Sequence, residues 1–224
     1  MQLAIFDLDH TLLAGDSDLL WGQYLCRMGA VDPEHYAPEN LRFYQEYQAG
    51  TLDIHAFAAF SMKPLTEHPR TQLEAWRRAF VDEVIEPIIC PGSEPLIARH
   101  RAEGATTLIM TATNRFITEP IAERLGVDHL IATDPEEHQG RFTGRIAGTP
   151  NFQAGKVTRL QQWRSSRGID QAHVTFYSDS RNDLPLLEAA DNAVAVDPDT
   201  VLEATARSRG WPVISLRGTT ATPT

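Results

Sequence analysis

The chain has 224 residues, 42% of them hydrophobic and 22% charged, which suits one domain or one domain with an insert. A formal net charge of −10 argues against a nucleic-acid partner, and the basic runs at 77–78 and 164–167 are short and lie in polar, helix-like stretches. Two cysteines without CxxC spacing predict a reducing, cytoplasmic location, and the apolar runs are too short for a signal peptide or a membrane helix.

The predicted elements begin with an apolar strand at 3–8, after which a long stretch shows no convincing strand. Helical patterns occupy this stretch, so we expect a helical insert at 16–85 directly after the first strand. The predicted helices of the insert are 18–28, 33–49, 53–62 and 70–85. Gly15 and Pro87 or Pro91 are the candidate hinges at its ends.

Beyond the insert, apolar strands alternate with helical patterns, and glycine follows several of the helices as a stop signal. The further strands are predicted at 106–111, 129–133, 173–178, 192–196 and 212–216. The helices between and after them are predicted at 94–103, 118–125, 152–167, 184–190 and 200–209. A small β-hairpin is expected at 140–146, and the tail 218–224 is expected to be disordered.

This alternation predicts an α/β fold, a Rossmann-like parallel sheet with helices on both faces, built from residues 1–15 and 86–217. Such sheets bind ligands at the carboxyl ends of their strands. Reactive side chains gather at three of these ends and at one helix start. They are Asp7, Asp9 and Thr11, then Thr111, Thr113 and Asn114, then Ser178, Asp179 and Asp183, with Lys156 opening a helix.

Four aspartates in one crevice would repel each other strongly unless a cation lay among them. Carboxylates without a nearby cluster of cysteine or histidine favour a hard ion, so Mg²⁺ is the expected cofactor. A carboxylate pair, a divalent ion, a lysine and a hydroxyl together make a phosphate site, in which one carboxylate can attack phosphorus. The expected partner is therefore a small phosphate ester.

Each of these residues also has a purely structural alternative when it is taken alone. Asp7 and Asp9 could begin a calcium loop, but the positions that need Gly and Glu hold Leu12 and Asp18. Thr111 could cap a helix at its strand end, and Lys156 could be a solvated helix residue. Asp183, Thr113 and Asn114 could likewise cap the helices that follow them.

The segments FDLDHT, LIMTAT and SDSRND, with Lys156 between the last two, resemble the four motifs of the haloacid dehalogenase superfamily of phosphatases. The insert resembles the helical cap of its phosphoserine-phosphatase-like branch. The resemblance implies that Asp7 attacks phosphorus to form an aspartyl phosphate, and that Asp9 protonates the leaving alcohol and then activates water. Thr111 and Lys156 would hold phosphoryl oxygens. The implied metal ligands are Asp7, the backbone carbonyl of Asp9, and Asp179, with Asp183 just behind them ordering a metal water or Lys156.

The sequence departs from that branch at two places that concern the substrate. Asp16 falls where phosphoserine phosphatases place the carboxylate that reads the substrate amine. Ala59, however, aligns near the arginine that reads the substrate carboxylate, and no Arg or Lys lies between residues 42 and 63. Ser178 also stands where the family usually has glycine. A site that has a carboxylate to bind the substrate amine, but no cationic side chain to bind a substrate carboxylate, favours a cationic substrate.

The segments LLAGDSDLLWG and TATNRF resemble bacterial phosphatases of this branch that act on histidinol phosphate, which has an amine and an imidazole but no carboxylate. The residues expected to contact this substrate are Asp16, Asp18, Glu46, Thr113 and Asn114. Three alternatives remain: a phosphoserine phosphatase, a phosphotransferase with the same intermediate, and a receiver-type signalling switch. Receiver domains lack both the helical insert and an acid two residues after the phosphate acceptor. His10, as an alternate residue at the strand end, is expected to point away from the site.

Overall fold

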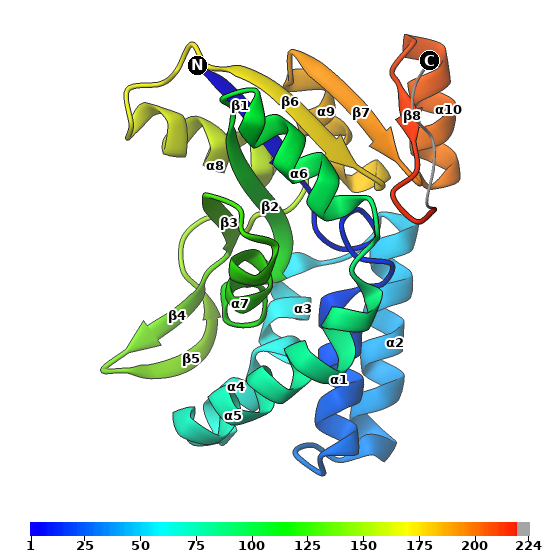
Figure 1. The fold of residues 1–224 in the computed structure, drawn as a ribbon. Coiled ribbons are helices and arrows are strands. Elements are labelled where there is room, and N and C mark those ends of the chain that lie inside the picture. The colour runs from blue at the N-terminus through cyan, green and yellow to red at the C-terminus, as the bar shows by residue number, and fades with distance from the viewer. Residues whose placement is uncertain (219–224) are drawn as a thin grey trace.

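Six parallel strands form the central sheet, in the order β3-β2-β1-β6-β7-β8 (Figure 1). The computed structural model describes residues 1–218, so all of the expected disordered tail except Gly218 lies outside the described residues. The strands are β1 Gln2–Phe6, β2 Thr106–Asn114, β3 His129–Thr133, β6 His173–Ser178, β7 Asn192–Val196 and β8 Val213–Ile214. The predicted strands at 3–8 and 212–216 end earlier in the structure, whereas the strand predicted at 106–111 continues to Asn114.

Both faces of the sheet are covered by helices, as the sequence predicts. Successive residues of β1 point to opposite faces. Ala4 and Phe6 pack in one apolar cluster with α6 Ser93–Ala102 and α7 Arg115–Leu125. Leu3 and Ile5 pack in a second cluster with the three helices of the other face, α8 Ala154–Ser165, α9 Leu184–Ala189 and α10 Thr200–Arg209. The predicted α/β fold is confirmed, although α7 begins before the predicted residue 118 and α8 after the predicted residue 152.

The order of the strands brings three strand ends together. β1 pairs with β2 on one side and with β6 on the other, so Phe6 lies beside both Ile109 and Tyr177. After β1 the chain adds β2 and β3 on one side of that strand. It later returns and adds β6, β7 and β8 on the other side. This change of direction opens a crevice at the carboxyl ends of the strands.

The insert contains five α-helices, and several of them begin at an aspartate. They are α1 Ser17–Arg27, α2 Pro33–Ala49, α3 Ile54–Ser61, α4 Lys63–Glu67 and α5 Arg70–Phe80. The carboxylates of Asp16, Asp32 and Asp53 accept backbone N–H bonds at the starts of α1, α2 and α3, and such a cap contributes about 1 kcal/mol. α2 ends at Gly50, whose φ of 74° lies in the left-handed region that favours glycine.

Two features of the insert differ from the prediction. The short helix α4 was not predicted, and the helix predicted at 70–85 is α-helical only to Phe80, where a π-helical turn, Val81–Ile85, follows. The segments that enter and leave the insert are hydrogen-bonded to each other, since Ala14 N–H donates to the Ile88 carbonyl at 2.7 Å and Cys90 N–H to the Leu12 carbonyl at 2.9 Å. The insert is therefore joined to the sheet by a paired, two-chain connection.

The predicted hairpin at 140–146 is wrong in its extent. Residues 141–146 form a single strand, β5 Arg141–Ile146, and its antiparallel partner is β4 Pro135–His138. The turn lies at Gln139 and Gly140, both with positive φ. The segment PEEH has none of the residues that favour strands, so its sequence gave no signal. The hairpin packs against α3 and α4 (Figure 1). Arg70 of α5 lies 3.0 Å from Glu137.

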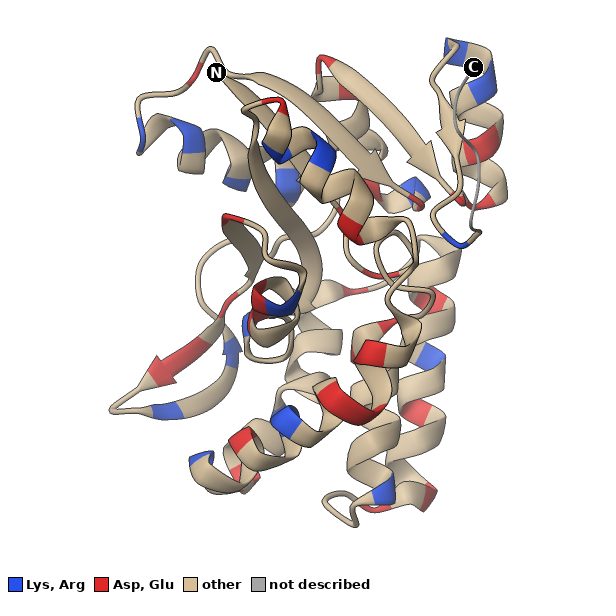
Figure 2. Cartoon of the chain, in the orientation of Figure 1, with Lys and Arg blue, Asp and Glu red and all other residues tan. Residues whose placement is uncertain are grey.

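Positions of basic and acidic residues are interspersed along the helices of the insert and of the core (Figure 2). No helix of the described part of the chain is both long and apolar enough to cross a membrane.

Candidate active site

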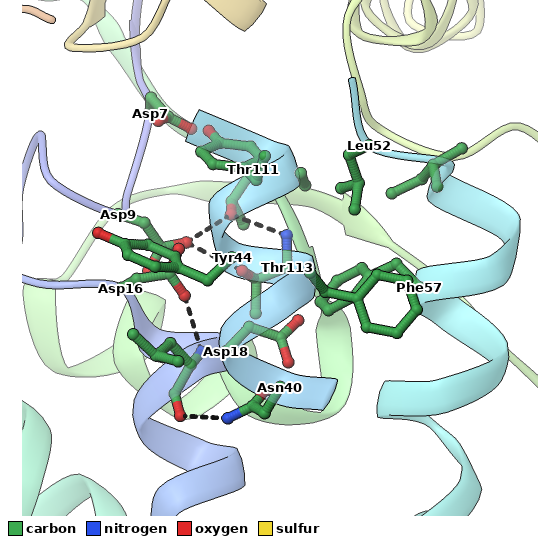
Figure 3. Close-up of a pocket in the computed structure, with 15 residues that line it drawn as sticks. Asp7, Asp9, Asp16, Asp18, Asn40, Tyr44, Leu52, Phe57, Thr111 and Thr113 are labelled. Carbon is green, nitrogen blue, oxygen red and sulfur yellow. Dashed lines mark hydrogen bonds between the residues drawn. The ribbon is translucent and has the colours of Figure 1, made fainter. Parts of the chain in front are cut away.

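Asp9 is held in place from two directions. Its Oδ1 accepts the backbone N–H of Ser17 at 2.6 Å. Its Oδ2 accepts the hydroxyls of Thr113 at 2.9 Å and Thr111 at 3.3 Å (Figure 3). The two threonines lie two residues apart on β2, where the pairing with β3 shifts register between Met110 and Asn114. A spacing of two puts both hydroxyls on one side of the strand. Thr111 therefore contacts Asp9, one of the two aspartates that follow β1, directly.

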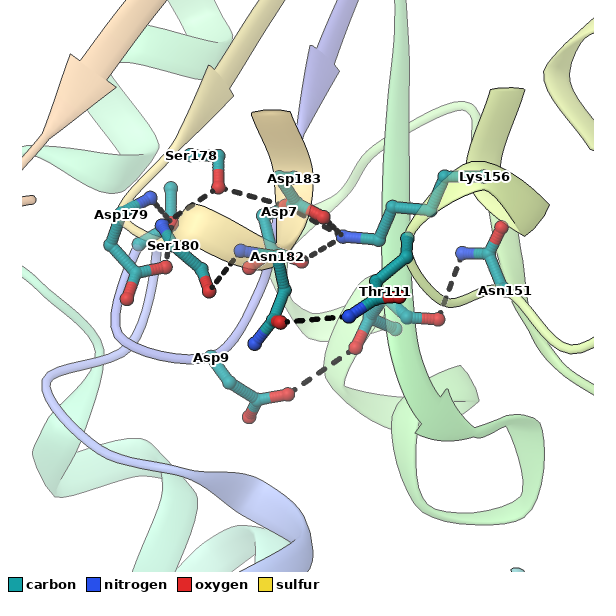
Figure 4. A network of polar contacts seen from close by, with 12 residues as sticks. Asp7, Asp9, Thr111, Asn151, Lys156, Ser178, Asp179, Ser180, Asn182 and Asp183 are labelled. Carbon is teal, nitrogen blue, oxygen red and sulfur yellow. Dashed lines mark hydrogen bonds and ion pairs between the residues drawn. The ribbon is translucent and has the colours of Figure 1, made fainter. Parts of the chain in front are cut away.

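Lys156 lies between two aspartates and is buried, with 2% of its surface exposed (Figure 4). Its Nζ donates to Asp7 Oδ1 at 2.8 Å and lies 2.7 Å from Asp183 Oδ1. Burial raises the pKa of Asp7 to about 7, and the ammonium of Lys156 opposes this shift. Burial alone would lower the pKa of Lys156, but the charges of Asp183 and Asp7 outweigh it and raise that pKa above its usual value.

Asp183 is fixed by a second contact as well as by Lys156. The hydroxyl of Ser178 donates to Asp183 Oδ2 at 2.8 Å and accepts the backbone N–H of Ser180 at 3.1 Å. The alternative in which Asp183 caps α9 is wrong, because its side chain makes no capping hydrogen bond there. The serine that replaces the expected glycine thus helps to orient the carboxylate behind the lysine.

Asp179 lies at the end of β6 and exchanges hydrogen bonds with Thr11. The Thr11 hydroxyl donates to Asp179 Oδ1 at 2.9 Å and accepts the backbone N–H of Asp179 at 3.0 Å. Burial and then the negative charge of Asp7 raise the pKa of Asp179 well above its usual range. Asp179 is therefore a buried carboxyl whose ionisation is made harder by the charge of Asp7.

The donor set fits a hard divalent cation. Among residues 1–218, no group of three or more His, Cys, Asp or Glu side chains surrounds a common metal position. The implied set needs only two such side chains, Asp7 and Asp179, because its third ligand is the backbone carbonyl of Asp9. Asp183 faces Lys156, which is one of the two positions expected for it. A cation beside Asp7 and Asp179 would remove their mutual repulsion, and their oxygen atoms suit Mg²⁺.

A pocket with an empty volume of about 510 Å³, which includes open solvent, lies between this crevice and the insert (Figure 3). Its acidic lining residues are Asp7, Asp9, Asp16 and Asp18. Its aromatic lining residues are Phe43, Tyr44 and Tyr47 of α2 and Phe57 of α3. No Lys, Arg or His from the described residues lines this pocket.

The structure brings three of the five expected substrate contacts to the pocket, namely Asp16, Asp18 and Thr113. Asn114 does not line the pocket, because its Oδ1 accepts the Ile117 N–H at 3.3 Å as the cap of α7. Glu46 also lies outside it and pairs with Arg42 on the exposed side of α2.

Residues 50–60 align with the part of the phosphoserine phosphatase cap that carries the arginine. They line the pocket at other positions than expected. Ala59 is exposed and does not line the pocket, whereas Leu52, Ile54 and Phe57 do. The alignment of Ala59 with a pocket position is therefore wrong. The segment contributes no cationic side chain to the pocket, because the three residues with which it lines the pocket are all apolar.

Asp16 and Asp18 lie in a pocket that no Lys, Arg or His side chain of residues 1–218 lines. Burial, followed by the charge of Asp9, raises the pKa of Asp16 to about 7, although the Leu19 N–H donates to its Oδ1 at 2.8 Å. Burial, followed by the charges of Asp16 and Asp9, raises the pKa of Asp18 well above its usual range. A cation bound beside these two carboxyls would favour their charged forms and lower both pKa values.

Several residues of the site gave no signal in the sequence. Asn151 joins two strand ends, because its Nδ2 donates to the carbonyls of Thr111 at 2.9 Å and Ile131 at 3.0 Å. His10, which was expected to point away, contacts the insert through its Nε2, 3.0 Å from the hydroxyl of Tyr44. The spacing of Phe43, Tyr44 and Tyr47 at adjacent turns of one helix was the available clue to the aromatic wall.

The chain is similar to several known proteins. A family model for haloacid dehalogenase-like hydrolases matches residues 4–188. A histidinol-phosphatase of Neisseria meningitidis is 43% identical over 220 residues, which cover 96% of this chain and 99% of that protein. A phosphoserine phosphatase of Mycobacterium tuberculosis is 30% identical over 217 residues, which cover 96% of this chain and 70% of that protein.

Two solved structures show the same architecture. A crystal structure of a protein with unknown function from Bordetella pertussis matches with a TM-score of 0.90 at 44% identity, over 96% of this chain and 98% of that one. A substrate-bound phosphoserine phosphatase matches with a TM-score of 0.72 at 19% identity, over 96% of this chain and 93% of that one. At that identity the second match concerns the fold alone.

Proposed function

Because the chain belongs to the haloacid dehalogenase-like hydrolases and is a phosphatase, we propose that it hydrolyses histidinol phosphate with Mg²⁺ through an aspartyl phosphate. The observation that carries the choice of substrate is the pocket itself, which is lined by four aspartates and by no cationic side chain of the described residues. The 43% identical histidinol-phosphatase supports the same choice.

In the proposed reaction an oxygen of Asp7 attacks phosphorus, and the bond between phosphorus and the ester oxygen breaks. Asp9 gives a proton to the departing alcohol and then takes one from the water that hydrolyses the aspartyl phosphate. The bonds from Ser17 N–H and the Thr113 hydroxyl would hold the Asp9 carboxyl in position for both transfers.

Lys156 and Thr111 would bind the phosphoryl oxygens. An ammonium has three N–H donors, and two of those of Lys156 are used by Asp7 and Asp183, which leaves one for phosphate. Asp7, Asp179 and the Asp9 carbonyl would hold Mg²⁺, which when bound would neutralise charge on the phosphoryl group.

The pocket disfavours phosphoserine for an electrostatic reason. Phosphoserine would bring a carboxylate beside Asp16 and Asp18, where no described side chain could pair with it, and an unpaired buried charge is costly. Histidinol phosphate lacks that carboxylate and carries an amine that Asp16 would bind. We place the reaction in the cytoplasm, which is supported by the two free thiols, Cys26 and Cys90.

The test is phosphate release by the purified protein with Mg²⁺, measured on histidinol phosphate and phosphoserine, with Asp7→Asn as the blank. We expect kcat/KM to be at least about 100-fold higher for histidinol phosphate, the scale of discrimination against an unpaired buried group. Asp9→Asn should lower kcat by about 100-fold or more, the usual contribution of a general acid.

Four outcomes would contradict parts of this proposal. A preference for phosphoserine would overturn the substrate, and full turnover by Asp9→Asn would overturn the role of that residue. Transfer of phosphate to an added alcohol in place of release would identify a phosphotransferase, which shares the same intermediate. If neither ester gave release that depended on Asp7, the assignment of histidinol phosphate would be wrong.

A further inference from the structure

One carboxylate of the pocket has no partner. Asp18 is 7% exposed and lines the pocket, yet its side chain makes no hydrogen bond or ion pair with any other residue in the range 1–218. Asp16, by comparison, accepts the Leu19 N–H, and Asp9 accepts three hydrogen bonds. A buried acid without a partner is costly to the folded protein, which suggests that its partner is supplied by a ligand.

Asp18 lies further from the attacking aspartate than Asp16 does. In Figure 3 the labelled side chains follow one another from Asp7 through Asp9 and Asp16 to Asp18. The electrostatic influences have the same order, because Asp9 is the main charge acting on Asp16, whereas Asp16 acts on Asp18 more strongly than Asp9 does. A ligand whose phosphate lies at Asp7 would therefore meet Asp16 first and Asp18 afterwards.

The neighbours of Asp18 cannot neutralise it. Asn40 lies beside it in the pocket, but its Nδ2 donates to the Leu19 carbonyl at 3.0 Å. Asn40 is held there by close packing against Gly22, where a Cβ atom would lie only 2.3 Å from that nitrogen. Phe43 and Phe57 form the adjoining wall and can contact the face or edge of a flat cationic ring.

We propose that Asp18 is a second cation receptor of the pocket, which binds a basic ring nitrogen of the substrate while Asp16 binds its amine. The inference rests on the proposed function and extends it. In histidinol phosphate the ring nitrogens lie further from phosphorus than the amine, which matches the order of the two aspartates. The site would thus select phosphorylated amino alcohols that carry a second basic nitrogen. Those with a single amine would be hydrolysed with a lower kcat/KM.

The test compares two substrates that differ only in the ring: histidinol phosphate and 2-aminopropyl phosphate. Asp18→Asn should lower kcat/KM for histidinol phosphate by about 10- to 100-fold, the range expected for losing one hydrogen bond to a charged group. The same variant should change kcat/KM for 2-aminopropyl phosphate by less than about 2-fold, since that substrate does not reach Asp18. Asp16→Asn should reduce both values.

Asp32→Asn is the matched control, because Asp32 caps α2 outside this pocket and asparagine caps equally well. It should leave both substrates unaffected. Inhibition by the product histidinol gives a second readout, and Asp18→Asn should raise its inhibition constant by the same factor as it lowers kcat/KM.

The outcomes separate the two proposals. Equal losses on both substrates with Asp18→Asn, or an unchanged inhibition constant for histidinol, would overturn the role of Asp18 and leave the phosphatase reaction intact. If the wild-type protein released no phosphate from histidinol phosphate in an Asp7-dependent way, the proposed function would fail and this inference with it.

Discussion

The ammonium of Lys156 balances two carboxylates that water hardly reaches. It lies 2.8 Å from Asp7 and 2.7 Å from Asp183, and the exposed fractions of the three side chains are 2%, 4% and 2%. The net contribution of such a buried group of charges to stability is small, because desolvation offsets much of the attraction. Removal of the single cation has a different result, since it leaves two buried anions without a counter-charge.

We therefore predict that Lys156→Met destabilises the protein by about 3–5 kcal/mol, the usual cost of breaking a buried ion pair. The free energy of unfolding should be measured with urea at pH 8 in the presence of a chelator. Adding Asp183→Asn to Lys156→Met should restore part of the loss, because only one buried anion then remains. Lys63→Met serves as the control, since Lys63 is exposed and lies 3.6 Å from Glu67. A loss no larger than that of the control would contradict the prediction.

Among the elements, the strand ends were the part of the site that the sequence could predict. Asp7, Thr111 and Asp179 follow apolar runs, and parallel strands bring such positions to one edge. The sequence could not show that β2 shifts its register between Met110 and Asn114, which sends Asn114 to a helix cap while Thr113 stays in the pocket. A bulge depends on the partner strand and leaves no period in the sequence.

The helices of the insert were predictable as elements, whereas their packing was not. Their capping aspartates and periodicity are local signals, but the wall made by Tyr47 and Phe57 depends on how α2 and α3 lie over the strand ends. The stop of α5 at Phe80 and the strand β4 at Pro135–His138 are likewise set by contacts distant in the sequence. For this reason the sequence predicted the site residues at the strand ends, whereas it did not predict most of the pocket wall that the insert contributes.

Asp16 has two opposing effects on α1. Its carboxylate caps the helix, but burial raises its pKa to about 7, so the charged form is unfavourable in the folded protein. The folded state then binds this proton more tightly than the unfolded state, whose aspartates have a pKa near 3.9. The free energy of unfolding must therefore fall as pH rises from about 4 to about 7, and stay low above it.

We predict that Asp16→Asn raises the free energy of unfolding at pH 8 by about 2 kcal/mol, less than the full shift would give because Asp16 is partly exposed. Asparagine keeps the cap and removes the charge. The advantage should disappear near pH 4, where the wild-type carboxyl is protonated. Urea unfolding without divalent ions checks this. Asp16→Ala, which loses the cap as well, should be less stable than Asp16→Asn by about 1 kcal/mol.

The control for this experiment is a cap that lies in solvent. Asp53 caps α3 and accepts the N–H groups of His55 and Ala56, and these bonds lower its pKa. Its charged form is therefore favoured by folding, so Asp53→Asn should not stabilise the protein at pH 8. The assignment of Asp16 as an acid whose charged form is disfavoured by folding would be wrong if both asparagine variants behaved alike.

At the scale of the whole molecule, the insert and the sheet share one apolar cluster. Phe6 of β1, Trp21 of α1 and Phe80 of α5 all belong to it and are almost completely buried. The paired segments at Leu13 and Ile89 join the same two parts through the backbone. Because these contacts are continuous, we expect the insert and the core to unfold together. Binding at the strand ends should then change the stability of the entire chain.

Mg²⁺ should therefore raise the free energy of unfolding of the wild-type protein, by about 2.7 kcal/mol when its concentration is a hundred times its dissociation constant. The physical reason is that burial disfavours the charged forms of both carboxyls and raises both pKa values, and that the charge of Asp7 adds to this at Asp179. A bound cation would stabilise both charged forms. Asp179→Asn should abolish this response, whereas Asp82→Asn, an exposed position on the insert, should retain it. Urea unfolding of the three proteins with a chelator and with saturating Mg²⁺ measures the effect. An equal response to Mg²⁺ in Asp179→Asn would show that the cation binds elsewhere, and the absence of a response in the wild type would contradict the proposed metal site.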